Sequence, residues 1–245
     1  MNRWLSIIGV WLLSVISLCA FTPQLSTVMP RGWQRGSEVL LHFHGERISD
    51  TQEILCYQPG ITFRDIKVVD DKHITALATI SADAPLGEHQ FRLRAAGGIS
   101  EMRLFLVGQF PCTDEVEPNN KFDQAQKVEV NTTVHGIATL EDEDYFVCHL
   151  KKGQRLTAEV EAIRLGQAMF DAYVAILDPQ RFELSARDDT PLLRTDCYAS
   201  IVAPADGEYR VVVREAAYEG SETCRYRLHI SHAPRPSAVY PTGAK

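Results

Sequence analysis

The chain has 245 residues, which is enough for one or two ordinary domains with hydrophobic cores. Its residues are 45% hydrophobic and 23% charged, as is usual for globular proteins. The formal net charge of −7 argues against nucleic acid as a partner, because phosphate binding needs a clustered basic surface.

The first 20 residues have the pattern of a secretory signal peptide. Arg3 precedes the uncharged, mostly apolar run WLSIIGVWLLSVISLCA. One cation, an apolar core and then small residues are typical of export signals, and cleavage is expected near Ala20. The alternative is that the segment stays uncleaved as a membrane anchor, since it is nearly long enough to span a bilayer. In both cases the rest of the chain is expected in the periplasm, on the cell surface or secreted.

The first predicted domain, residues 26–108, consists of alternating strands separated by turns. In EVLLHFHG, Leu41 and Phe43 share one face, whereas His42 and His44 share the other. This period of two indicates a half-buried strand. Two histidines at this spacing occur in some metal sites, but no third ligand lies near in the sequence. We therefore expect them to be surface histidines.

The periodicity is lost between Val107 and Glu115, in GQFPCTDEVEPNN, and resumes in a second predicted domain, residues 115–231. AYVAIL (172–177) is continuously apolar and predicts a central strand. In RYRLHI, three apolar residues alternate with Arg225, Arg227 and His229, which predicts a half-buried strand. At most a turn or two of helix is expected, near Lys121 to Lys127. The fold class is therefore all-β, with two β-sandwich domains after the signal segment.

Residues 232–245, HAPRPSAVYPTGAK, are Pro-rich and predict a linker. Within them, SAVYPTG (237–243) matches STVMPRG (26–32) at Ser, Val, Pro and Gly. Because the earlier copy opens the first domain, we interpret the later one as the start of a further repeat.

Export makes disulfides permissible for the cysteines beyond the signal. These are Cys56, Cys112, Cys148, Cys197 and Cys224. Their number is odd, so at least one thiol stays unpaired within the chain. Cys197 and Cys224 each stand at the start of a predicted strand, and we expect them to pair. The alternative is that some are simply buried small side chains.

Several motifs of the second domain occur together in order: EVEPNN, EDEDYF (141–146), KKGQRL, FDAYVAILD, ARDD, PADGEYRVVV and YRLHI. Together they resemble the bacterial pre-peptidase C-terminal domain, a jelly-roll-like sandwich of secreted proteins that includes the collagen-binding domains of collagenases. The first domain, with PRGWQRGSEVLLHFHG and LGEHQFRLRAAGGIS, is similar to immunoglobulin-like modules of the plexin and transcription-factor type. The combination is similar to large exported proteins of planctomycete-type bacteria.

The resemblance implies a calcium site. In the collagenase-type relatives, acidic and amide groups of the linker and of a later acidic segment hold the ion. The corresponding residues are Glu115, Glu117, Asn119, Asn120, Glu141 and Asp144, together with the Tyr145 carbonyl. Hard oxygen donors of this kind suit Ca²⁺. The chain departs from the calcium-binding relatives at Asn120 and Glu141, so weakened affinity is expected. The alternative is that the amides form a turn while the acids remain solvated.

None of the GxSxG, HExxH, Walker-type or GxGxxG motifs occurs in the sequence. We therefore predict a non-catalytic exported module of the cell envelope, with an adhesive, binding or structural role. Its expected partners are an extracellular protein or polysaccharide, or attached domains, and a membrane only if the N-terminal segment is uncleaved. The alternative is an accessory part of a secreted peptidase or other hydrolase, acting in folding, secretion or substrate binding.

Overall fold

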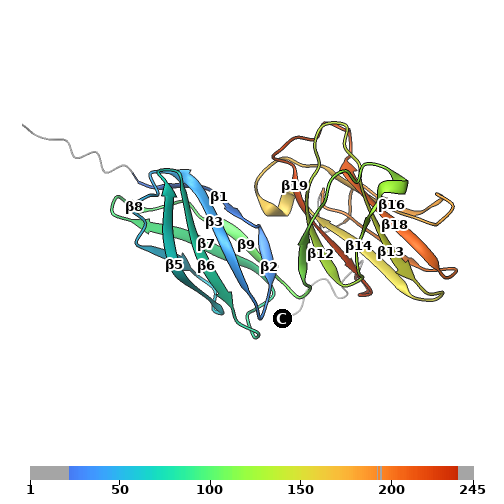
Figure 1. The fold of residues 1–245 in the computed structure, drawn as a ribbon, viewed down its shortest axis with the longest axis horizontal. Coiled ribbons are helices and arrows are strands. Elements are labelled where there is room, and N and C mark those ends of the chain that lie inside the picture. The colour runs from blue at the N-terminus through green and yellow to red at the C-terminus, as the bar shows by residue number, and fades with distance from the viewer. Residues whose placement is uncertain (1–21, 192, 194, 237–245) are drawn as a thin grey trace, which may run out of the picture.

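The computed structural model describes residues 22–191, 193 and 195–236. These residues form an all-β protein of two β-sandwiches that follow one another along the long axis (Figure 1). The predicted signal segment and the repeat at 237–243 lie outside the described residues. Among the described residues, no helix is long and apolar enough to cross a membrane.

The first sandwich has two facing sheets. One has the order β1 (Gln24–Met29), β3 (Glu38–Glu46), β6 (His73–Ile80) and β5 (Ile61–Asp70), and all its neighbours are antiparallel. The other has the order β2 (Gly32–Gln34), β9 (Arg103–Gly108), β7 (Gly87–Ala95) and β4 (Glu53–Cys56), with β8 (Gly98–Ile99) paired to β7. Strand β2 runs parallel to β9.

The second sandwich also has two sheets. One has the order β10 (Cys112–Asp114), β12 (Thr132–Ile137), β19 (Arg225–Ser231), β14 (Arg155–Glu161) and β17 (Tyr198–Val202). The other has the order β11 (Gln126–Lys127), β13 (Asp144–Leu150), β18 (Gly207–Glu215), β15 (Ala172–Leu177) and β16 (Glu183–Arg187). Two short 3₁₀ turns, η1 (Phe122–Gln124) and η2 (Ile163–Leu165), are the helical elements among the described residues.

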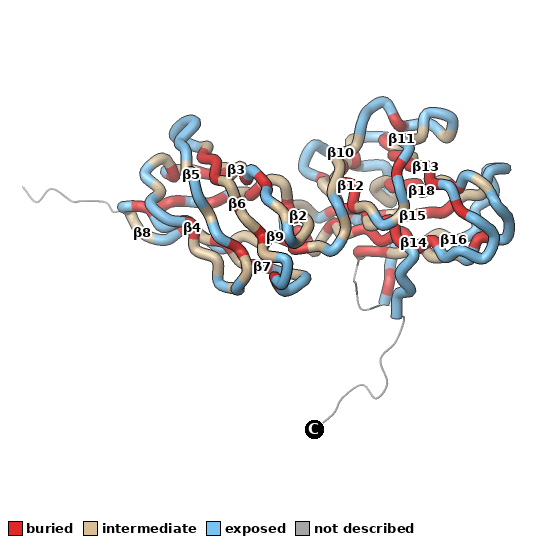
Figure 2. Tube along the Cα trace, turned by 60° about the horizontal axis from the view of Figure 1, so that its bottom comes forward, coloured by how far each residue is buried: buried red, intermediate tan, exposed pale blue. Residues whose placement is uncertain are grey.

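Alternating side chains build a separate core in each sandwich. In β3, Leu41 and Phe43 are buried, whereas His42 and His44 on the other face are half-buried, as predicted. The predicted central strand 172–177 is β15, which lies between β18 and β16. Figure 2 shows the buried segments running along the strands, while the turns are exposed. Burying one face of each strand is the main stabilising contribution to such sheets.

The domain junction lies at residues 109–111, between β9 and β10. The first sandwich starts at Gln24, close to the predicted residue 26. The second starts at Cys112, three residues before the predicted Glu115, because β10 pairs in parallel with β12. That short edge strand carries no apolar alternation, so the sequence pattern did not mark it.

The predicted Cys197–Cys224 disulfide is wrong. All five cysteines among the described residues are free thiols. Cys197 precedes β17 and Cys224 precedes β19, and these two strands lie on opposite sides of β14. Strands separated by a third strand lie about 9–10 Å apart, whereas a disulfide needs Cα atoms within about 7 Å.

Candidate functional site

Three carboxylates from the two acidic motifs meet beside the domain junction. Glu115 and Glu117 belong to the segment after β10, and Asp144 begins β13. One oxygen from each of the three lies within 4.8 Å of the others. Asp144 is fully buried and Glu115 half-buried, whereas Glu117 is exposed. The cluster is therefore open to solvent on the Glu117 side. We call Glu115, Glu117, Asn119 and Asp144 the oxygen cage.

The Tyr226 hydroxyl connects two members of the oxygen cage. It lies 2.7 Å from Asp144 Oδ2 and 3.0 Å from Glu115 Oε2. One hydroxyl proton can be donated to only one of these oxygens at a time. Gly136 on β12 lets this contact form, since a Cβ there would lie 2.2 Å from the Tyr226 ring and 2.4 Å from the Glu115 carboxylate.

The charges of the cage are poorly balanced by protein groups. Among the described residues, no lysine, arginine or histidine forms an ion pair with Glu115, Glu117 or Asp144. Burial, followed by the nearby Glu115 charge, raises the pKa of Asp144 to about 8. Burial likewise raises the pKa of Glu115 to about 7. Close carboxylates need either shared protons or a cation to remain together.

Asn119 is fully buried, with one terminal amide atom turned toward the carboxylates. An amide nitrogen in that position donates to Asp144 at 3.1 Å and to Glu117 at 3.1–3.2 Å. If the amide oxygen points inward instead, every atom that the cage offers to a metal ion is an oxygen. The backbone fixes this residue, because the Asn119 N–H donates to Glu117 and its carbonyl accepts from the Tyr145 N–H. The Glu117–Pro118 peptide bond is cis.

The side chains of the other predicted residues lie outside the cage. The Asn120 side-chain amide donates to Asp142 at 2.5 Å. Glu141 is exposed, with a positive φ of 56°. The Tyr145 hydroxyl donates to Glu143, and its N–H donates to the Asn119 carbonyl, whereas the predicted role of its own carbonyl stays a prediction. The structure therefore brings together the side chains of Glu115, Glu117, Asn119 and Asp144.

Sequence reasoning missed Asp142 and Tyr226. Asp142 is buried and accepts hydrogen bonds from Asn120 and from the backbone and hydroxyl of Thr139. These hydrogen bonds stabilise the loop before β13. Asp142 is part of the EDEDYF motif, so the sequence could have indicated it. Tyr226 was predicted only as a buried strand residue, and nothing in its local pattern pointed to the acids more than 80 residues earlier.

The chemistry of the cage fits Ca²⁺. Three carboxylates and an amide oxygen are hard donors, and water reaching the exposed Glu117 side completes the six to eight oxygens that Ca²⁺ takes. Glu115, Glu117, Asn119 and Asp144 are the residues that would hold the ion. Its charge would replace the protons that the close carboxylates otherwise share.

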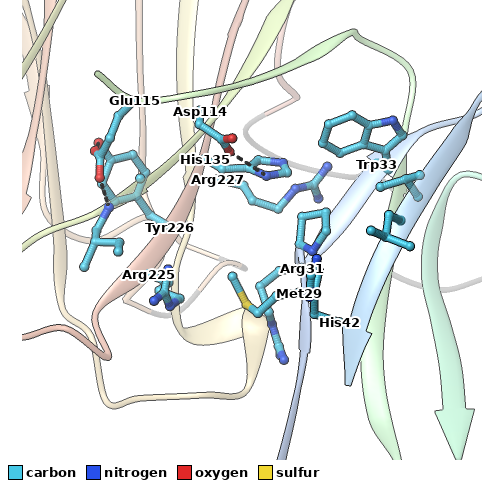
Figure 3. A pocket seen from close by; sticks show the side chains of 15 residues that line it. Met29, Arg31, Trp33, His42, Asp114, Glu115, His135, Arg225, Tyr226 and Arg227 are labelled. Carbon is cyan, nitrogen blue, oxygen red and sulfur yellow. Dashed lines mark hydrogen bonds and ion pairs between the residues drawn. The ribbon is translucent and has the colours of Figure 1, made fainter. Parts of the chain in front are cut away.

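Glu115 and Tyr226 also line a cleft of about 450 Å³ between the two sandwiches (Figure 3). The first sandwich contributes Met29, Arg31, Trp33 and His42, and the second contributes Asp114, His135, Arg225 and Arg227. Figure 3 shows the Arg227 guanidinium and the Trp33 ring on the same side of His135, with Arg225 and Arg31 on another side of the cleft. The Trp33 and His135 ring centroids are 5.8 Å apart.

The cleft is formed by residues that hold the sandwiches together. Arg31 donates from Nη2 to the backbone carbonyl of Leu165 in the second sandwich. Arg227 lies against Gly32, where an added Cβ would be 2.8 Å from its Cζ. In the described part of the chain, Nε of Arg31 and both Nε and Nη2 of Arg227 are buried without a hydrogen-bond partner. These guanidinium groups are therefore packed into the junction behind the cleft surface.

Comparison with known proteins gives no family assignment. No family model matches the chain, and no curated protein matches it. Among solved structures, it is similar to the SGBP-B protein of a Bacteroides ovatus mixed-linkage glucan utilization locus, at 10% identity with a TM-score of 0.28, covering 75% of this chain and 71% of that one.

Two further similar structures are a Vibrio cholerae secreted serine protease, VesC, and the Yersinia pseudotuberculosis adhesin InvE. VesC is 11% identical with a TM-score of 0.30, covering 83% of this chain and 49% of VesC. InvE is 10% identical with a TM-score of 0.27, covering 85% of this chain and 58% of InvE. At such TM-scores these likenesses carry no argument about function.

Proposed function

We propose that the chain is a non-catalytic, exported binding module of the cell envelope, in which Ca²⁺ stabilises the junction between two sandwiches. The observation that carries the proposal is the position of Glu115. Its carboxylate belongs to the oxygen cage, and the same residue lines the cleft. An ion held by the cage would therefore fix one wall of the cleft.

The resemblance of EVEPNN and EDEDYF to the calcium-binding motifs of collagenase-type domains supports the same ion. An exported protein meets millimolar calcium, which matches the affinity of extracellular calcium modules, with Kd of about 10⁻⁴–10⁻³ M. Asn120 and Glu141 lie outside the cage, which leaves fewer protein ligands and favours the weak end of this range.

The cleft is the proposed ligand-binding site. Its volume suits a small-molecule-sized unit, such as a few sugar rings of a polysaccharide, more than a protein surface. The positive charge of Arg31, Arg225 and Arg227 in the cleft lining favours ligands with hydroxyl or carboxylate acceptors. Of the two predicted ligand classes, an extracellular protein and a polysaccharide, we therefore prefer the polysaccharide.

Thermal unfolding with and without calcium tests the ion. We expect millimolar Ca²⁺ to raise the melting temperature of the chain, because a ligand that binds only the folded state stabilises it by mass action. Glu117→Gln should abolish most of that rise while leaving the calcium-free melting temperature nearly unchanged, since Glu117 is exposed.

The matched control is Glu129→Gln, which removes an exposed carboxylate outside the cage. This variant should keep the full calcium response. No rise in the wild-type chain, or an equal loss in both variants, would show that the cage holds shared protons and not an ion.

A further inference from the structure

Three histidines that are separated in the sequence lie together on the outer face of the first sandwich. His44 on β3 is directly opposite His73 on β6, and His42 lies two residues before His44 on the same face. One ring nitrogen from each lies within 4.8 Å of the others. His42 Nδ1 is 3.0 Å from His73 Nε2.

The three imidazoles form a stack of rings. The ring centroids of His44 and His73 are 4.3 Å apart and those of His42 and His73 are 5.2 Å apart. All three residues are half-buried, so the ring edges remain within reach of solvent. The strand pairing, and not a loop, sets their spacing.

We propose that His42, His44 and His73 form a binding site for a divalent transition metal of the zinc class. Three imidazole ligands with a fourth position left to water are a known arrangement for Zn²⁺ in proteins. Imidazole nitrogen is a borderline donor that suits Zn²⁺, Cu²⁺ and Ni²⁺, whereas Ca²⁺ and Mg²⁺ prefer oxygen. The site is therefore chemically distinct from the oxygen cage.

A carboxylate beside the histidines favours a cation at this place. Asp70 acts on His44 as a nearby negative charge. Asp70 is paired with His73 across β5 and β6, which places it beside the cluster.

Only a small rearrangement would be needed for binding. Tetrahedral coordination at the usual Zn–N distance places ligand nitrogens about 3.3–3.4 Å from one another. In the structure the rings are nearly parallel, with interplanar angles of 9–26°. Rotation about χ2, which is a broad torsion for histidine, would turn the lone pairs toward one point.

The position of the site connects it with the cleft. His42 lines the cleft as well as belonging to the histidine cluster. A metal held by the three rings would lie at the first-sandwich wall of the cleft, where His42 is paired with Met29 of β1. This inference depends on the metal alone and does not require the proposed polysaccharide or the calcium ion.

The test is isothermal titration of the chain, purified without any histidine tag, with Zn²⁺ at neutral pH. We expect one Zn²⁺ per chain, still bound in millimolar Ca²⁺. His73→Gln and His44→Gln should each weaken binding by about 100-fold or more, since even residues that only hydrogen-bond to a zinc ligand contribute about 10–100-fold. The control His149→Gln, at an exposed position on β13, should bind as the wild type does.

X-ray absorption of the zinc-loaded wild-type chain adds a readout that needs no variant. Three imidazole nitrogens and one oxygen are expected around the metal. The proposal is overturned if no stoichiometric binding occurs, if His73→Gln binds as tightly as the wild type, or if the absorption spectrum shows mainly oxygen ligands.

Discussion

His135 illustrates how the domain junction constrains a single side chain. Its ring contacts Trp33 of the other sandwich edge-on, and its Nε2 has no hydrogen-bond partner within the described part of the chain. Burial, followed by the charges of Arg227 and His229, lowers the pKa of His135 to about 3. The native junction therefore accommodates the neutral imidazole and resists its protonation.

This depressed pKa predicts that His135 makes a destabilising contribution in acid. Below about pH 6.5, the ordinary histidine pKa, the unfolded chain binds a proton that the native protein does not bind until the pH approaches 3. The contribution of His135 to the free energy of unfolding should then fall by up to about 1.4 kcal/mol per pH unit, opposite in sign to the contributions of Asp144 and Glu115, whose pKa values are raised. We expect His135→Gln to lack this component in urea unfolding measured from pH 7.5 to pH 5.

The matched control is His149→Gln, whose side chain is exposed on β13. This variant should show the same dependence of the free energy of unfolding on pH as the wild type. Parallel pH profiles for the wild type and His135→Gln would contradict the account of His135 as a neutral buried group.

At the scale of elements, sequence alternation predicts which residues share a face but not what covers that face. In β19, Arg225, Arg227 and His229 do oppose the apolar residues, yet Arg227 is only 2% exposed. The first sandwich covers it, through Gly32 and Gly108. Contacts between domains produce no hydrophobic periodicity in either sequence segment. The burial of Arg227 could therefore not be predicted.

The sites show the same division between local and distant information. Glu115, Glu117 and Asn119 could be predicted because one short motif carries them. Tyr226 and His73 could not, since each joins its site through strand pairing. In particular, His73 joins His42 and His44 because the register of β3 and β6 places it opposite His44. Predicting this contact would require knowing that β3 pairs with β6.

The pairing of β14 with β19 gives a prediction about the buried arginine. Arg227 donates to Glu161 at 2.6 Å, and His229 lies 3.1 Å from the same carboxylate oxygen. Burial opposes the ionised carboxylate, but the charges of Arg227 and His229 hold the pKa of Glu161 well below its usual range. Glu161→Gln should lower the free energy of unfolding by about 3–5 kcal/mol, because it leaves a buried guanidinium without its counter-charge.

Urea unfolding of single and double variants measures this coupling. The double variant Glu161→Leu with Arg227→Met removes both charges and should cost less than the sum of the two single replacements. Strict additivity, or a loss below about 1 kcal/mol for Glu161→Gln, would show that the pair contributes little.

For the whole molecule, the two hydrophobic cores are independent clusters, and the chain crosses between the sandwiches once, at residues 109–111. A small set of contacts then sets the angle between the domains, including Arg31 with Leu165, Trp33 with His135, and Arg227 with Gly32. The oxygen cage anchors the segment that follows the crossing to the start of β13. Junctions of this kind open locally more easily than the cores unfold.

Limited proteolysis in the presence and absence of calcium tests this picture. We expect millimolar Ca²⁺ to slow cleavage after Glu115 by a glutamate-specific protease, and after the nearby exposed Lys121 by trypsin, by about two- to tenfold, as Kd values of about 10⁻³–10⁻⁴ M imply. Cleavage in the native state requires local opening, and an ion bound only by the closed cage lowers the open population in proportion to its binding. Lys72, in the exposed turn between β5 and β6, is an internal control whose cleavage should not change. Glu117→Gln should cancel the protection at both junction sites, and equal protection at Lys72 would instead indicate a general effect of calcium on the protease.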